Sequence, residues 1–330
     1  MGINLMLHNQ TNNFFKEKKY NCLKPYQIVN NNDTVFVSAG IQPILKDYRE
    51  GKIENYNKVF VAQPVIRTQY INYIDEGSSI AFTNITSSGF NNSEEEYNKM
   101  VKDWYEFMEE IGISSKKIIT VSDIYEDIWD DLEVIGRRTF HYYKDVEIGD
   151  TTFFSKVTKD NKKINIESMS DLGFGLERLR WVSNDKSYFD LYSDAKKIDV
   201  NIKAYLSVIA LLAVNNVKPS NKNSGYRARL FSKRLVSLLE GSNLDEDQNG
   251  YLDECIKYWL EWQDNNINFD KNIILNEYIR NSNRFIIDLL TKEGYKNLLG
   301  ININISRDEL NKRLISSGVD EERVKRLVRR

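Results

Sequence analysis

Residues that build metal centres and disulfide frameworks are scarce in this chain of 330 residues. It has two histidines, His8 and His141, and two cysteines, Cys22 and Cys255. Two histidines exclude a histidine-rich metal site and argue against catalysis by a histidine base. Two cysteines are too few for a disulfide framework and fit the reducing cytoplasm. We therefore expect a cytoplasmic protein without a metal site built from its own side chains.

Long hydrophobic runs are missing as well. No apolar stretch approaches the roughly 20 residues of a membrane-spanning helix, and no secretory signal is visible at the N-terminus. The net charge of −2 does not by itself predict a nucleic-acid partner. With 41% hydrophobic and 28% charged residues, the composition is that of a globular protein with no membrane partner. The length predicts two domains, or one large domain with an appendage.

Charged residues are nevertheless unevenly distributed. Residues 123–133 carry six acidic and no basic side chains, whereas residues 222–234 carry five basic and no acidic ones. A solvated helix face is the simplest interpretation of each run.

Residues 245–253 resemble a calcium-binding loop, but Ile256 stands where the bidentate glutamate is required. We therefore predict an acidic turn between helices at that position and no calcium site.

Short β-rich segments dominate the first half of the chain, and their spacing is too irregular for βαβ units. These segments are residues 34–38, 58–62, 80–85, 117–121, 151–157 and 163–167. The best-marked helix begins at Ser93, which forms a capping box with Glu96, and ends at Gly112. The pattern predicts a mainly antiparallel sheet with helices packed on it.

Strand signals stop after about residue 195, and helical periodicity takes over. The predicted helices are residues 202–215, 226–240, 252–263, 273–293 and 307–316. On the second of these, Arg229 and Lys233 lie opposite the apolar face, with Arg227 and Arg234 at its margins. We place the domain boundary near 194–197. The basic stripe is either a surface for RNA phosphates or a solvated face.

The most informative stretch is residues 171–179, Asp-Leu-Gly-Phe-Gly-Leu-Glu-Arg-Leu. Gly173 and Gly175 let the backbone approach a ligand closely, or they shape a tight turn. Arg178 lies where a strand gives way to a helix, so its planar guanidinium can meet a phosphate or stack on a base. Gly-x-Gly-x-Glu-Arg-Leu resembles the third signature motif of class II aminoacyl-tRNA synthetases.

Upstream segments extend this resemblance to alanyl-tRNA synthetases, in order and in spacing, over nearly the whole chain. The matching segments are 14–40, 35–49 (VFVSAGIQPILKDYR), 60–71 (FVAQPVIRTQYI), 80–85 (IAFTNI) and 218–235. The resemblance implies an α+β fold, with a class II synthetase-like antiparallel sheet flanked by helices and followed by an all-helical domain. Residues 1–195 are then the catalytic domain that activates the amino acid, and residues 196–330 a helical tRNA-recognition-like domain.

The resemblance also implies a reaction. An amino-acid carboxylate attacks the α-phosphate of ATP, with Mg²⁺ on the phosphates, and the resulting aminoacyl-adenylate is transferred to tRNA. Arg67 matches the arginine that grips the α-phosphate, and Arg178 the one on the ATP tail and adenine. Phe82 matches an aromatic beneath the base, although an ordinary core aromatic is an equal alternative. Gly173 and Gly175 would line the ATP site.

On the amino-acid side, Asp171 falls where the family holds a carboxylate against the substrate's α-ammonium. A helix N-cap is the alternative role for this residue. Asp150 aligns with a family asparagine near the amino group, and Gly149 aligns with the preceding tryptophan, whose loss would vacate volume. Thr83 stands where the family has a glutamate that recognises adenine. These departures predict a substrate other than alanine, larger or with a second amino group.

Other expectations concern the partners. In the family, residues corresponding to Arg227, Arg229, Lys233 and Arg234 would meet the tRNA acceptor stem. The family's editing motifs and C-terminal domain are not seen, so the resemblance implies a short paralogue without editing. Transfer to a carrier protein or a small molecule is a second possibility, and a non-catalytic tRNA- or amino-acid-binding paralogue is a third. Class II catalytic domains commonly pair, so a homodimer stays open.

Overall fold

The chain folds into two compact units, one centred on residues 1–191 and the other on residues 192–330. The computed structural model describes residues 3–29, 34–53, 57–75, 77–129, 131–159, 162–163, 165–184, 188–191, 197–262 and 269–328. Most of the predicted boundary at 194–197 lies outside the described residues. The functional roles given above to residues 1–195 and 196–330 stay predictions.

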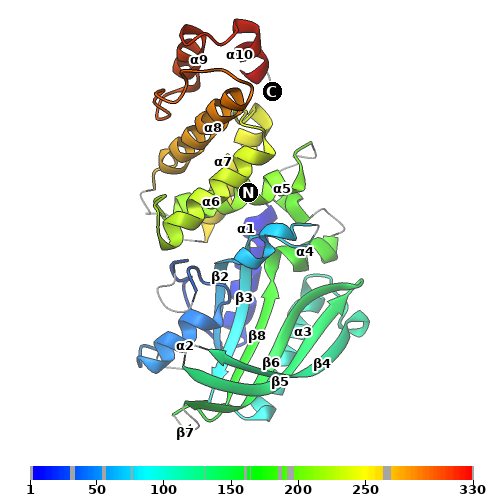
Figure 1. The fold of residues 1–330 in the computed structure, drawn as a ribbon. Helices are drawn as coiled ribbons and strands as arrows, with labels where there is room; N and C mark the ends of the chain where they lie inside the picture. The colour runs from blue at the N-terminus through cyan, green and yellow to red at the C-terminus, as the bar shows by residue number, and fades with distance from the viewer. Residues whose placement is uncertain are drawn as a thin grey trace. The chain divides into compact units, whose positions relative to one another are not determined.

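The first unit is built on an eight-stranded sheet in the order β1-β2-β3-β8-β6-β5-β4, with β7 paired to β6 (Figure 1). Its strands are β1 (Asn21–Cys22), β2 (Val59–Ile66), β3 (Ala81–Phe90), β4 (Ile119–Trp129), β5 (Leu132–Tyr143), β6 (Val146–Lys159), β7 (Lys162–Lys163) and β8 (Met169–Gly175). The short β1 pairs in parallel with β2, and the other described pairs are antiparallel. The predicted antiparallel sheet and α+β class are confirmed.

Some local predictions were wrong. Residues 34–38 form no strand, and within them Phe36 makes an isolated bridge with Val29. Of the predicted strand at 163–167, Lys163 belongs to β7 and residues 165–167 form no strand. The acidic run at 123–133 is not a helix face, because it belongs to the hairpin of β4 and β5. Strand β4 lies at the edge of the sheet with nearly all its side chains exposed, so no buried face marks its period in the sequence.

Helices cover both faces of this sheet, and the alternation of side chains along each strand decides which face a residue meets. Helix α2 (Ile41–Arg49) shares one core with Val59 and Val61 of β2. Helices α1 (Ile3–Glu17) and α3 (Glu94–Glu110) lie on the other face, where Phe15 stacks on Phe60 with ring centroids 4.2 Å apart. Trp104 of α3 joins this aromatic cluster. The predicted capping box at the start of α3 is confirmed.

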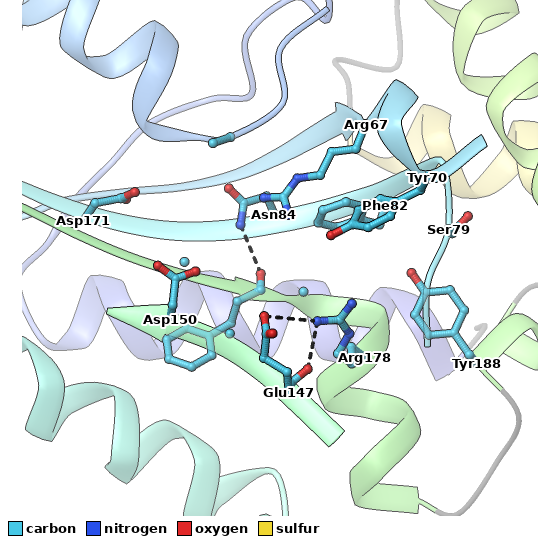
Figure 2. A pocket seen from close by; sticks show the side chains of 15 residues that line it. Arg67, Tyr70, Ser79, Phe82, Asn84, Glu147, Asp150, Asp171, Arg178 and Tyr188 are labelled. Carbon is cyan, nitrogen blue, oxygen red and sulfur yellow. Dashed lines mark hydrogen bonds and ion pairs between the residues drawn. The ribbon is translucent and has the colours of Figure 1, made fainter. Parts of the chain in front are cut away.

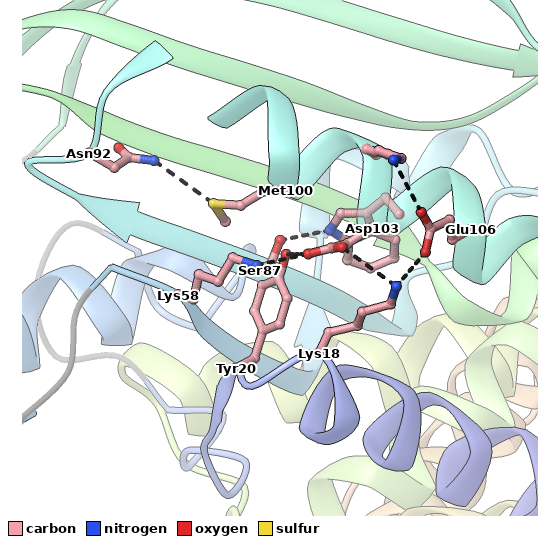
Figure 3. Close-up of polar contacts among 10 residues, drawn as sticks. Lys18, Tyr20, Lys58, Ser87, Asn92, Met100, Asp103 and Glu106 are labelled. Atoms are coloured by element: carbon pink, nitrogen blue, oxygen red, sulfur yellow. Dashed lines mark hydrogen bonds and ion pairs between the residues drawn. The ribbon is translucent and has the colours of Figure 1, made fainter. Parts of the chain in front are cut away.

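A charged cluster ties these helices to the start of β2 (Figure 3). Asp103 of α3 accepts hydrogen bonds from Lys58 Nζ at 2.9 Å and from Tyr20 Oη at 3.1 Å. Lys18 bonds to Glu106 one turn further along α3. Burial raises the pKa of Tyr20 well above its usual range, so the phenol stays a donor. The cluster holds the first residues of a strand whose other end leads into the candidate site.

The remaining elements of the first unit are short helices next to strand ends. They are η1 (Thr68–Asn72), η2 (Ser115–Lys117), α4 (Leu176–Asn184) and η3 (Tyr188–Leu191). Helix α4 follows β8 without a loop, as the strand-to-helix junction at the glycine motif predicted. Both oxygens of the buried Glu177 carboxylate in α4 accept the Thr83 backbone N–H at 2.9 Å. The first turn of α4 is therefore fixed to β3.

The described part of the second unit is all-helical, as predicted. Its helices are α5 (Val200–Val214), α6 (Asn223–Leu238), α7 (Glu246–Glu261), α8 (Asn272–Lys292), α9 (Arg307–Ser316) and α10 (Glu321–Val328). The calcium-like segment is not a turn between helices, because Asp245 accepts the Gln248 N–H at 2.8 Å and α7 begins there. Among the described helices, none has the length and apolarity needed to cross a membrane.

Candidate active site

A pocket opens on the α2 face of the sheet, where β2, β3, β6 and β8 lie near η1 and α4 (Figure 2). The sequence-predicted residues of the ATP and amino-acid sites all line this one pocket. They are Arg67, Phe82, Gly149, Asp150, Asp171, Gly173, Gly175 and Arg178. Sequence reasoning missed the other lining residues, which are Ala39, Tyr70, Ser79, Asn84, Glu147, Phe174 and Tyr188.

Strand register explains how residues so far apart in the chain meet. Phe82 pairs with Val65 near the end of β2, and Asn84 pairs with Gly175 of β8. Across the other edge of β8, Gly173 pairs with Asp150 of β6. Because alternate residues of a strand face the same side, the two-residue spacing of Asp171, Gly173 and Gly175 puts all three on the pocket floor.

Arg67 follows the last residue of β2, where its side chain lies over the Phe82 ring with the guanidinium carbon 4.9 Å from the centroid. Its Nε donates to the Ser38 carbonyl at 2.9 Å, and its backbone N–H donates to Ile80 at 2.8 Å. The two terminal nitrogens have no hydrogen-bond partner among the described residues. One edge of this guanidinium is thus fixed by the protein, and the other can take a ligand.

Arg178 is held in a similar way on the opposite side of the pocket. Its Nε donates to the Gly77 carbonyl at 2.9 Å, and Nη1 donates to the Glu147 carbonyl at 2.8 Å. The Glu147 carboxylate lies 3.9 Å from Nη1. Gly77 has φ +96°, and a Cβ there would lie 2.5 Å from the Trp181 ring, so only glycine fits. Neither Gly77 nor Glu147 was foreseen, because both act on Arg178 through backbone carbonyls.

The glycines of the motif keep the pocket floor open. A Cβ on Gly175 would contact Arg178 at 3.5 Å and Phe82 at 3.9 Å, and one on Gly173 would lie 3.3 Å from the Asn84 amide nitrogen. Gly149 has a different role, because its Cβ would lie 2.3 Å from the Gly173 carbonyl oxygen. Its missing side chain therefore serves close contact between β6 and β8. The expectation that a lost indole vacates pocket volume at this position was wrong.

The acidic residues of the pocket carry unusual electrostatics. Burial raises the pKa of Asp150 to about 6, against the opposing effect of Arg67. Burial and the neighbouring Asp150 raise the pKa of Asp171 well above its ordinary value. The Oδ1 atom of Asp171 is buried and has no hydrogen-bond partner. Asp171 lies inside β8, before the glycine motif, so the alternative role as an N-cap of α4 is excluded.

Asn84 is the clearest site residue that the sequence did not reveal. Its Oδ1 accepts the Gly40 N–H at 2.7 Å and the Thr86 hydroxyl at 2.9 Å. This contact holds the segment before α2 against the sheet beside the pocket. The available signal was its position two residues after Phe82 on the same strand, which puts both side chains on one face. Ser79, also on the wall, has a buried hydroxyl with no hydrogen-bond partner.

The predicted basic stripe lies on α6 in the second unit, and its members differ. The Nε of Arg229 donates to the buried Glu277 carboxylate of α8 at 3.1 Å, so this arginine serves the packing of two helices. Lys233 and Arg234 are exposed, Arg227 is half-buried, and none of the three makes an ion pair with the described residues.

Comparisons with known proteins name no family for this chain. No family model and no curated protein sequence matches it. Among solved structures it is similar to the structure of Desulfitobacterium hafniense PylSc, a pyrrolysyl tRNA synthetase. That match has 13% identity and a TM-score of 0.41, and it covers 56% of this chain and 70% of the other. The fold class therefore rests on the sheet and helices described above, and the resemblance to alanyl-tRNA synthetases stays a prediction.

Proposed function

We propose that the first unit activates an amino acid with ATP, forming an aminoacyl-adenylate and pyrophosphate. The observation that carries this proposal is the convergence of Arg67, Phe82 and Arg178 on the same pocket as Asp150 and Asp171. Two guanidinium groups, each anchored on one side by backbone carbonyls, suit the charge that develops on a phosphate during transfer. Half-buried carboxylates beside them suit an ammonium group.

In this proposal the amino-acid carboxylate oxygen forms a bond to the α-phosphorus, and the bond from that phosphorus to the bridging oxygen of pyrophosphate breaks. The free nitrogens of Arg67 neutralise the α-phosphate and orient the carboxylate, while Arg178 binds the rest of the triphosphate. The base stacks near Phe82. Asp171 binds the α-ammonium, which positions the carboxylate for in-line attack.

Magnesium would reach the site on the phosphates of ATP. The described residues contain no cluster of three or more His, Cys, Asp or Glu side chains able to hold a metal ion by themselves. In many nucleotide-dependent enzymes Mg²⁺ is held by substrate phosphates together with one or two carboxylates and several waters. The ion would add to the charge neutralisation that the two guanidinium groups provide.

We propose tRNA as the acceptor, because Arg227, Lys233 and Arg234 form a basic surface without ion pairs on α6. In the second step a ribose hydroxyl attacks the carbonyl of the adenylate, and AMP leaves. A carrier protein or a small-molecule nucleophile remains the alternative acceptor. A non-catalytic paralogue that only binds tRNA or an amino acid would need none of this chemistry.

ATP–pyrophosphate exchange over a panel of amino acids tests the proposal. We expect exchange with at least one amino acid, and a loss on the order of 10²–10³-fold in Arg67→Ala. Arg137→Ala, which removes an exposed arginine from β5, is the matched control and should keep full exchange. If no amino acid supports exchange, activation is excluded and the non-catalytic paralogue remains as the alternative. Ribonuclease sensitivity of the labelled product then separates tRNA from the other acceptors.

A further inference from the structure

Two carboxylates lie side by side on the pocket floor, at the end away from Arg178. Asp150 of β6 pairs with Gly173, and Asp171 lies two residues before Gly173 on β8. The two aspartates are therefore diagonal neighbours on the same face, a relation that puts Cβ atoms roughly 7 Å apart or less. Figure 2 draws both carboxylates at this end of the pocket.

The pocket has too few cations for these acids. The charged and polar groups around Asp150 are Arg67, Glu147, Arg138, Thr152 and Asp171. Arg138 is already bidentate on Asp123, at 3.1 and 2.7 Å. Arg178 lies against Glu147. Arg67 remains as the one guanidinium that both aspartates share among the described residues, and the proposed chemistry commits its free edge to phosphate.

A cationic ligand would compensate these acids in their ionised forms. The orphaned Oδ1 of Asp171 is a buried acceptor that lacks a donor, which is costly unless a bound group supplies one. An α-ammonium on Asp171 supplies such a donor and leaves Asp150 as a second, half-buried carboxylate. Beyond these residues the pocket adjoins a larger groove, which Ala39 and Asp171 also line. There is room here for a side chain longer than a methyl group.

We propose that the amino acid activated in this pocket is a diamino acid, with its α-ammonium on Asp171 and its side-chain ammonium on Asp150. The inference rests on the proposed function and specifies its substrate class. A short, flexible chain between two amines matches two carboxylates on adjacent strands. A neutral side chain of the same length would leave the Asp150 carboxylate without a cationic ligand beside it, so it should bind more weakly.

The test compares diamino acids with isosteres that lack the second amine. Ornithine and 2,4-diaminobutyrate are paired with norleucine and norvaline, in calorimetric titrations with a non-hydrolysable ATP analogue and in pyrophosphate exchange. We expect the best diamino acid to exceed its neutral partner by at least about tenfold in both measurements. Asp150→Asn should shrink that preference to about threefold or less. Glu167→Gln, which removes an exposed carboxylate just before β8, is the matched control and should preserve it.

The outcomes separate the inference from the function on which it rests. Exchange that is best with an aliphatic amino acid and insensitive to Asp150→Asn overturns the diamino acid and leaves activation intact. Binding of a diamino acid that depends on Asp150, without exchange of any amino acid, overturns activation and supports the cation site. If Asp150→Asn alters only the Mg²⁺ dependence of exchange, Asp150 binds the metal and the inference is overturned. An unchanged melting temperature excludes misfolding as the cause.

Discussion

The two ends of the pocket differ in the sign of their charge and in how the protein holds the charged groups. At the end proposed for the nucleotide, Arg67 and Arg178 are bonded through Nε to the Ser38 and Gly77 carbonyls, so the protein fixes them before any ligand arrives. At the other end, Asp171 keeps a buried oxygen without a donor. Preorganised cations cost little to align when phosphate charge develops. We therefore expect occupancy of that end to depend on a cationic ligand.

Removing a fixed cation should have the largest effect. We expect Arg178→Ala to lower pyrophosphate exchange on the order of 10²–10³-fold with little change in melting temperature, because the polar partners of the guanidinium among the described residues are two backbone carbonyls and one exposed carboxylate. Arg178→Lys keeps the charge but loses the planar fork, so it should recover only part of the rate. Equal exchange in both variants and the wild type would place the triphosphate elsewhere.

Disturbing the carbonyl that fixes Arg178 should have the next largest effect. Gly77→Ala puts a Cβ against the Trp181 ring at a backbone conformation that favours glycine. We expect exchange to fall on the order of 10–10²-fold, because a small misplacement of a catalytic group is costly. Gly51→Ala is the matched control, since it too has positive φ but has no atom within 4 Å of the added Cβ. Thermal unfolding of both variants separates backbone strain from loss of positioning.

The acidic end should respond to pH. The pKa of Asp150 is about 6 in the folded protein, above the ordinary 3.8. Between these two pH values the folded protein without ligand therefore binds more protons than the unfolded chain. Its stability should therefore decrease as pH rises through this window. Binding of a cationic ligand needs the ionised carboxylate, so its affinity should rise about tenfold between pH 5 and pH 7. Calorimetric titration of Asp150→Asn should show a smaller rise, because Asp171, whose pKa is also raised, must still ionise. A rise of equal size in that variant would point to another group.

Helix α6 also carries both an ion-paired arginine and an exposed lysine without an ion pair among the described residues. We expect the smallest effects of substitution there. Arg229→Ala leaves the Glu277 carboxylate buried without this partner, so it should destabilise the protein by about 1–3 kcal/mol in thermal or urea unfolding. Lys233→Ala removes an exposed charge and should leave stability unchanged. If α6 meets a tRNA, Lys233→Ala should weaken RNA binding a few-fold and reduce its salt dependence by about one phosphate contact. Equal RNA binding by Lys233→Ala and the wild type would argue against this surface.

Sequence patterns predicted the sheet and the site best where local chemistry is distinctive. The apolar runs of β2 and β3, the capping box at Ser93 and the Gly-x-Gly motif before Arg178 all appear in the structure as expected. The hairpin of β4 and β5 was missed because β4 is an exposed edge strand with acids on both faces. Its strand conformation comes from hydrogen bonds to β5, and those leave no apolar period in the sequence.

Sequence alone determined which residue types are available for chemistry: two arginines far apart, an aromatic, and acids beside glycines, with few histidines and cysteines. Tertiary structure decided which of them share a pocket, since strand pairing brings Arg67, Asp150 and Arg178 together. It also decided which charged side chains form ion pairs within the protein, such as Arg229 with Glu277. The physical reason is that charge and shape are properties of a residue, whereas burial and partnership depend on the distant segments that pack around it.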